Sequence, residues 1–179
     1  MKYEDKILEL FKDGYLTTKD VTENNIPRTY LTKLTKENEI ERVSRGLYIR
    51  ESSFVDDFVV LQNKSKNAIF SNGTALYLHG FSNRIPIKYD LTVNSGYNGT
   101  LQKDYNVNLF YIKKELLNLG VIDYKLNSGN IIKVYDLEKT ICDIIKNKKK
   151  IDAELFNKAI RDYFYSKNKN TLKLYEYAK

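Results

Sequence analysis

The side chains whose types and spacing best suit binding chemistry lie between Pro27 and Asn38. Four polar residues there fall at i, i+3, i+4 and i+7, namely Thr29, Thr32, Lys33 and Lys36. On a helix this spacing puts all four on one face, and we expect no acid on that face. Leu31 and Leu34 recur three apart on another stripe and can be buried. Hydroxyl and ammonium groups on an exposed helix face can contact the phosphates and base edges of DNA.

The segment after this helix predicts a hairpin with a basic tip. Two short apolar stretches, Glu39–Val43 and Leu47–Arg50, are joined by Ser44-Arg45-Gly46. Gly46 permits the positive φ that a tight turn requires. Arg28 at the start of the helix, Arg42 in the first strand and Arg45 at the tip add three cations that can reach DNA. Three acids, Glu37, Glu39 and Glu41, oppose binding if they face the duplex.

The residues before this region complete a winged helix-turn-helix. Apolar spacing predicts a first helix over Tyr3–Lys12, ended by Asp13-Gly14. A short second helix over Asp20–Asn24 can be capped by Thr17 or Thr18. In helix-turn-helix proteins the second helix of the motif enters the major groove. That position falls on the helix bearing the four polar residues, so we predict DNA contacts from Arg28, Thr29, Thr32, Lys33, Lys36, Arg42 and Arg45.

The remainder of the chain predicts a second domain, so the fold class is α+β. An N-terminal winged helix-turn-helix (residues 1–52) is followed by a mixed α/β C-terminal domain (residues 53–179) with a small sheet and terminal helices. The expected helices cover Phe54–Gln62, Gly73–His79 after a Ser71 cap, Lys113–Leu119 as a turn, Asp136–Lys146, Ile151–Tyr165 and Thr171–Ala178. The expected strands cover Tyr89–Val93, Asn106–Ile112, Val121–Leu126 and Ile131–Tyr135, and Ala68–Phe70 is expected to be a short buried stretch.

The positive charge of the chain lies outside the predicted DNA reader. Residues 1–52 contain ten Lys/Arg and ten Asp/Glu, whereas residues 53–179 contain twenty and thirteen, which accounts for the net charge of +7. A basic stripe can be an electrostatic footprint on nucleic acid, although surface lysines also simply solvate helices. The densest run is a predicted loop after Lys146, and we expect phosphate contacts from Lys148, Lys149 and Lys150.

Composition indicates a cytoplasmic protein without a cofactor. The chain has no apolar run of the roughly 18–20 residues that a membrane helix needs. The N-terminus lacks a signal-peptide core, and Cys142 is the single cysteine, so no internal disulfide can form. The sequence contains no Gly-rich phosphate loop, no paired Cys/His metal set and no serine elbow. His79, the lone histidine, is expected to be structural because no other histidine or cysteine lies near it.

One pattern leaves an enzymatic alternative open. Asp123-Tyr124-Lys125 on a predicted strand, with Asp90 or Asp104 upstream, is similar to the acid and D-x-K core of a metal-dependent nuclease. Such a site would hold a divalent cation on carboxylates while the lysine stabilises charge. The triplet also arises by chance in a chain with 23 acids and 30 bases. A transcription factor responsive to a ligand or a partner is a further alternative.

Taken together, several segments resemble one known family. The segments are, in order, GYLTTKDV, IPRTYLTKL, RVSRGLYIR, IFSNGTALYLHGFSNRIP, LTVNSGY and VYDLEKTICDII, and the resemblance in order and spacing covers the chain from Gly14 to about Tyr177. They resemble the AbiEi-like antitoxins of type IV toxin–antitoxin systems, which act in abortive infection as a phage defence.

The resemblance implies a DNA-binding antitoxin and transcriptional repressor of its own operon. It implies a nucleotidyltransferase toxin as functional partner, countered without a stable complex. It further implies positive surface for double-stranded operator DNA on both domains. No catalytic residue is carried over, so we expect neither enzymatic activity nor a metal. Tyr77, Tyr89, Asp136, Thr140 and Asp143 match the family pattern and are expected to be structural.

Overall fold

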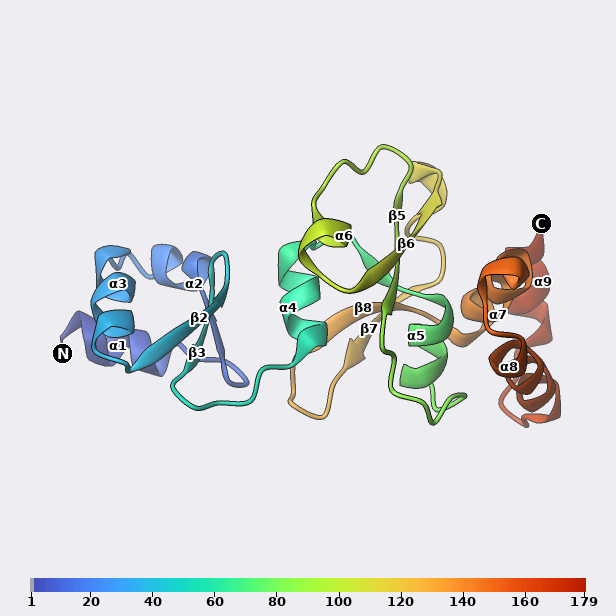
Figure 1. Ribbon diagram of the computed structural model, residues 1–179, viewed down its shortest axis with the longest axis horizontal. Coiled ribbons are helices and arrows are strands. Elements are labelled where there is room, and N and C mark those ends of the chain that lie inside the picture. Colours follow the sequence, from blue (N-terminus) through green and yellow to red (C-terminus); the bar gives the residue numbers. More distant parts are fainter. Residues whose placement is uncertain (1) are drawn as a thin grey trace. The chain divides into compact units, whose positions relative to one another are not determined.

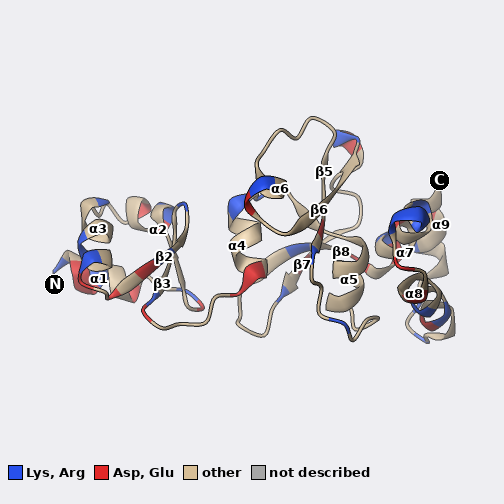
Figure 2. Cartoon of the chain, viewed as in Figure 1, with Lys and Arg blue, Asp and Glu red and all other residues tan. Residues whose placement is uncertain are grey.

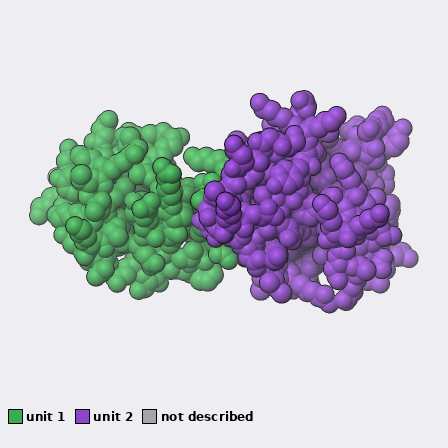
Figure 3. All heavy atoms as spheres, turned by 45° about the horizontal axis from the view of Figure 1, so that its top comes forward, with its two compact units in different colours: residues 1–66, 125–131 green, residues 67–124, 132–179 purple. Residues whose placement is uncertain are grey.

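The computed structural model describes residues 2–179, which form two compact units (Figure 1). The N-terminal unit extends to Lys66 and includes Lys125–Ile131, and the C-terminal unit comprises Asn67–Tyr124 and Ile132–Lys179 (Figure 3). Each unit has its own core and is described by itself. The functional boundary at residue 52 stays a prediction. No helix within residues 2–179 is long and apolar enough to cross a membrane.

The N-terminal unit combines helices with a small antiparallel sheet. Its elements are α1 (Tyr3–Glu9), β1 (Tyr15–Thr17), α2 (Thr18–Glu23), α3 (Thr29–Lys36), β2 (Ile40–Ser44), β3 (Leu47–Arg50) and α4 (Asp57–Lys64). The sheet order is β1-β3-β2, with Tyr15 opposite Ile49 and Arg42 opposite Tyr48. Three helices followed by a β-hairpin form the predicted winged helix-turn-helix. The predicted fold class is therefore confirmed for this unit.

Local signals and burial explain these elements. Thr17 is the N-cap of α2: its hydroxyl accepts the Asp20 N–H at 3.2 Å, and the Asp20 carboxylate accepts the Thr17 N–H at 2.8 Å. This reciprocal pair satisfies two N–H groups that a helix start otherwise leaves open. Leu31 and Leu34 of α3 are each 2% exposed. They belong to the core formed by Ile7, Leu16, Val21, Ile26, Leu31, Leu34 and Ile40.

The C-terminal unit is a mixed sheet followed by helices, as predicted. Its strands are β4 (Ile69–Phe70), β5 (Tyr89–Asn94), β6 (Val107–Ile112), β7 (Val121–Lys125) and β8 (Ile131–Tyr135). Its helices are α5 (Asn72–Leu78), α6 (Leu101–Asp104), η1 (Lys114–Leu116), α7 (Leu137–Lys146), η2 (Lys148–Lys150), α8 (Ala153–Tyr165) and α9 (Thr171–Ala178). The strand order is β6-β5-β4-β8-β7. Strand β4 is antiparallel to β5 and parallel to β8, and β5 is parallel to β6.

Buried apolar side chains join α5, α7 and α8, and acidic or amide caps fix where the later helices begin. The shared core is formed by Leu76, Ile141, Ile144, Ala159 and Tyr163. Asp136 caps α7 through the Lys139 N–H at 2.8 Å, as predicted. Asp152 caps α8, which therefore begins at Ala153, two residues later than expected.

Two predicted helix starts are corrected by the hydrogen bonds. The helix expected from Phe54 begins at Asp57, because the Asp56 carboxylate accepts the Phe58 N–H at 2.9 Å. Ser71 does occupy the N-cap position of α5, but its hydroxyl does not cap the helix and instead accepts the Thr92 hydroxyl at 2.8 Å. The cap comes from another element, since Asp90 of β5 accepts the Gly73 N–H at 2.9 Å.

Candidate nucleic-acid interface

The four polar residues of α3 do lie on one exposed face. All four are exposed, and together with Glu37 they line a single shallow depression on the surface of the N-terminal unit. The expectation that this face carries no acid is wrong, because Glu37 follows Lys33 by one helical turn and lies beside it. The face thus offers two hydroxyl groups and two ammonium groups beside one carboxylate. This donor-rich composition suits contact with phosphates and base edges.

Lys33 is already engaged by acids. Its Nζ lies 2.5 Å from Glu4 Oε1 of α1 and 3.9 Å from Glu37 Oε1. The hydrogen bond and charge of Glu4 raise the pKa of Lys33, and the same bond lowers the pKa of Glu4. Lys33 therefore stays protonated. It can contact a phosphate only by sharing its ammonium group with Glu4 or by leaving it.

The turn between α2 and α3 sets where the α3 face begins. Asn25 has φ +55°, in the left-handed region that Asn tolerates, and the Ile26 N–H donates to the Val21 carbonyl at 3.1 Å. Arg28 is the N-cap residue of α3, and its Nε donates to the Thr22 hydroxyl at 3.1 Å. The predicted Arg28 side chain is thus exposed but tied to α2.

The hairpin of β2 and β3 is held against the start of α2. Gly46 has φ +77°, as the turn was predicted to require, and its carbonyl accepts the Thr18 N–H at 2.9 Å and the Thr18 hydroxyl at 3.2 Å. A Cβ on Gly46 would lie 2.6 Å from Thr18 Oγ1, so only glycine fits this contact. Sequence reasoning missed the role of Thr18, because the two residues are 28 positions apart.

The other predicted DNA-contact cations of the N-terminal unit differ in whether their side chains already have a hydrogen-bond partner. Arg42 is exposed, and its Nε donates to the Ser44 carbonyl at 3.3 Å. Arg45 at the hairpin tip and Lys36 on α3 are exposed, and within residues 2–179 their side chains take part in no ion pair or hydrogen bond. Acids and bases are interspersed over this unit (Figure 2). Lys36 and Arg45 are therefore the cations best able to take a phosphate without first losing a partner.

The three predicted lysines of the C-terminal unit are exposed but not in a plain loop. Lys148, Lys149 and Lys150 form the 3-10 turn η2. The Lys148 ammonium lies 5.0 Å from the centre of the Phe156 ring, and that of Lys150 lies 5.8 Å from the centre of the Phe110 ring. These aromatic contacts restrict where two of the three charges can point.

The acids of the nuclease alternative have different partners. Asp123 Oδ1 lies 3.8 Å from Lys133 Nζ, whereas the Asp90 carboxylate accepts the Gly73 N–H and the Asn108 amide, each at 2.9 Å. His79 Nε2 lies 2.8 Å from the Tyr135 carbonyl oxygen, which is a structural contact. Over the described part of the chain, no three His, Cys, Asp or Glu side chains are grouped so that they could hold a metal ion.

Comparisons with known proteins support the family resemblance for the N-terminal unit in particular. Residues 5–50 match the family model described as "Transcriptional regulator, AbiEi antitoxin". No curated protein matches the chain at a significant level. Among solved structures, the crystal structure of the RV2827C protein from Mycobacterium tuberculosis is similar with a TM-score of 0.55 at 10% sequence identity. The similarity covers 92% of this chain and 69% of that chain, and at this identity it concerns the fold.

The matched segment contains most of α1, all of α2 and α3, and the β2–β3 hairpin, so it includes every predicted DNA-contact residue of the N-terminal unit. The resemblance found in the sequence is thus confirmed over the part of the chain that carries the α3 face. Residues 5–50 of this chain are similar to the AbiEi antitoxins, which that family model describes as transcriptional regulators.

Proposed function

We propose that this protein is a DNA-binding antitoxin that represses its own type IV toxin–antitoxin operon. The observation that carries the proposal is the exposed α3 face, which presents Thr29, Thr32, Lys33 and Lys36 from the second helix of a helix-turn-helix. In this role residues 1–52 bind double-stranded operator DNA, and residues 53–179 act as the antitoxin domain. The protein works in the cytoplasm, without a cofactor and without catalytic activity of its own.

Each group on the interface has a different task in this proposal. Thr29 and Thr32 have short side chains with hydroxyl groups that can donate to and accept from base edges in the major groove. Lys36 and Arg45, which pair with no acid among residues 2–179, bind phosphates and fix the register of the protein on the duplex. Lys33 moves from Glu4 to a phosphate, so DNA binding breaks one ion pair of the free protein.

The basic excess of the C-terminal part supplies further phosphate contacts. The N-terminal 52 residues are net neutral, yet affinity for DNA depends largely on the release of counterions from phosphates. Lys148, Lys149 and Lys150 are exposed and adjacent in the chain, so they form the densest local positive charge. We assign them to the phosphate backbone, where they add affinity without reading sequence.

The antitoxin role extends the family description to a partner. The proposed toxin is a nucleotidyltransferase encoded beside this gene, which the antitoxin counters without a stable complex, so that cells infected by phage can abort growth. Support for this rests on the family match over residues 5–50.

A reporter assay, a growth assay and size-exclusion chromatography test the function. A reporter driven by the promoter of the operon should be repressed by this protein, and repression should be lost when Thr32 and Lys36 are both replaced by Ala. Co-expression with the neighbouring gene product should rescue growth, while size-exclusion chromatography of the mixture should give two separate peaks. A reporter that ignores the protein contradicts the repressor role, and growth arrest that persists on co-expression contradicts the antitoxin role.

A further inference from the structure

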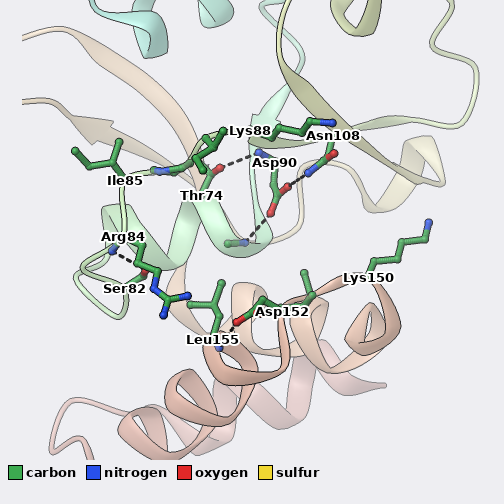
Figure 4. A pocket seen from close by; sticks show the side chains of 14 residues that line it. Thr74, Ser82, Arg84, Ile85, Lys88, Asp90, Asn108, Lys150, Asp152 and Leu155 are labelled. Atoms are coloured by element: carbon green, nitrogen blue, oxygen red, sulfur yellow. Dashed lines mark hydrogen bonds between the residues drawn. The ribbon is translucent and has the colours of Figure 1, made fainter.

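The C-terminal unit contains a pocket that shares one residue, Lys150, with the proposed DNA contacts. It has a volume of about 300 Å³, at the lower end of the range for small-molecule sites (Figure 4). Its walls come from the start of α5, the Ser82–Lys88 segment, the sheet residues Asp90 and Asn108, and the chain from Lys150 to Leu155. Sequence reasoning did not predict it, because these segments are far apart in the chain.

The buried carboxylate of Asp90 and Gly73, which has no side chain, form the floor of the pocket. Asp90 is 9% exposed, and each of its oxygens accepts one hydrogen bond, from the Gly73 N–H and from the Asn108 amide. A carboxylate oxygen has two lone pairs, so each retains capacity for another donor. A Cβ on Gly73 would lie 3.1 Å from Asp90 Oδ2 and 3.4 Å from Leu155 Cδ2, so a side chain there would reduce the depth of the pocket.

The mouth of the pocket is basic and partly apolar. Arg84, Lys88 and Lys150 line it, and within residues 2–179 only Arg84 of these three pairs with an acid, Glu154 at 2.7 Å. The one acid at the mouth, Asp152, accepts the Leu155 N–H at 2.9 Å as the cap of α8. In Figure 4, Asp90 and Asn108 lie across the pocket from Asp152 and Leu155.

Apolar side chains flank these cations. Ile85 is 72% exposed and Ile87 is 87% exposed, and both line the same pocket, as do Ile151 and Leu155. Exposed branched aliphatic side chains beside lysines offer contact to a ligand that has an anionic group and an apolar surface.

We propose that this pocket binds a small phosphate monoester that also carries hydroxyl groups, such as a sugar phosphate or a nucleoside monophosphate. The phosphate takes Lys88 and Lys150 at the mouth, because two ammonium groups that no acid of the described chain neutralises suit a dianion. The hydroxyl groups donate to the free lone pairs of Asp90 on the floor. A nucleobase, where the ligand has one, packs against Ile85 and Ile87.

Isothermal titration calorimetry of the full chain at low salt tests the proposal, without DNA, so that the result is independent of the proposed DNA contacts. The probes are AMP, ribose 5-phosphate, adenosine and inorganic phosphate. Both phosphate monoesters should bind saturably, and adenosine and inorganic phosphate should each bind at least about tenfold more weakly, since each lacks one set of charged hydrogen bonds. Tighter binding of AMP than of ribose 5-phosphate identifies a nucleotide as the ligand, and equal binding identifies a sugar phosphate.

Matched variants assign the binding to the pocket. Lys150→Ala should weaken binding of ribose 5-phosphate about tenfold, whereas Lys149→Ala, an exposed neighbour that does not line the pocket, should leave it unchanged. Lys88→Ala repeats the test at a second exposed position, and Asp90→Asn tests the floor, with circular dichroism to check its fold. The proposal is overturned if neither monoester binds more tightly than inorganic phosphate, or if Lys149→Ala weakens binding as much as Lys150→Ala.

Discussion

Replacing Gly46 by Ala tests how the hairpin is fixed to the helix-turn-helix. Gly46 has φ +77°, and the new Cβ would lie 2.6 Å from Thr18 Oγ1. The left-handed conformation costs a residue with a Cβ about 1–2 kcal/mol. The clash also displaces the Thr18 hydroxyl from the Gly46 carbonyl, and a hydrogen bond of this kind contributes about 0.5–1.5 kcal/mol. The N-terminal unit should therefore lose roughly 1.5–3.5 kcal/mol of unfolding free energy in Gly46→Ala.

Gly14→Ala is the matched control for backbone strain. Gly14 has φ +84°, but a Cβ there would meet nothing within 4 Å among the described residues, so we expect a loss of only about 1–2 kcal/mol. Thr18→Ala is the control for the clash, because the Thr18 Cβ lies 3.9 Å from the new methyl group, which is an ordinary van der Waals distance. In a Thr18→Ala background, Gly46→Ala should cost no more than Gly14→Ala does in the wild type.

Urea unfolding followed by the amide signals of the N-terminal unit in NMR spectra measures these losses for that unit alone. The same variants should be compared for affinity to operator DNA, since a displaced hairpin moves Arg45. Equal destabilisation by Gly46→Ala and Gly14→Ala would refute the close approach of Gly46 to Thr18. So would a Gly46→Ala loss that is unchanged when Thr18 is replaced.

Three further outcomes are expected. Replacing Lys148–Lys150 by Ala should flatten the slope of log affinity for DNA against log salt by about 0.9 for each phosphate that is no longer neutralised, and an unchanged slope would contradict a role of these lysines at the DNA backbone. Lys139→Met should destabilise the C-terminal unit by about 3–5 kcal/mol in urea unfolding, because it leaves the Asp143 carboxylate buried without its ion pair. A loss below about 1 kcal/mol would contradict a stabilising role of this ion pair. Burial raises the pKa of the Asp90 carboxyl in the folded protein above its value in the unfolded chain. The folded protein therefore gains stability relative to the unfolded chain as pH falls through the folded pKa. The stability of the wild type relative to Asp90→Asn should therefore increase as pH falls from 7 towards the ordinary pKa of 3.8, and a constant difference would contradict it.

Local sequence signals were sufficient to predict most helices and strands of the fold. Helical spacing and caps predicted α9 over Thr171–Ala178 and the Asp136 cap of α7, and the glycine at the hairpin turn predicted the positive φ of Gly46. The signals failed where an element is very short or its partner is distant. Strand β1 has three residues and exists because it pairs with β3, and α5 receives its cap from Asp90, 17 positions from Gly73.

The residues of the candidate interface likewise include some that local sequence could predict and others that only tertiary packing brings together. Helical periodicity was enough to collect the four polar residues of the α3 face, and the i+4 spacing from Lys33 could also have identified Glu37. Glu4 could not be found so, because only the packing of α1 beside α3 brings it to Lys33. The pocket of the C-terminal unit lay beyond sequence reasoning altogether, since Gly73, Asp90 and Lys150 meet through tertiary structure.

The most direct test of the account is the affinity of the α3 face for operator DNA. Fluorescence anisotropy should compare three proteins: the wild type, the double variant Thr32→Ala/Lys36→Ala, and Lys12→Ala. Each is titrated with a duplex from the promoter of the operon and with a duplex of shuffled sequence. Lys12 is an exposed cation that lines a different surface of the same unit. A hydrogen bond to a base edge is worth about 1–3 kcal/mol, so the double variant should bind the operator at least about fivefold more weakly, while Lys12→Ala binds as the wild type does. A folded double variant with unchanged operator affinity would contradict the central claim that this face reads DNA.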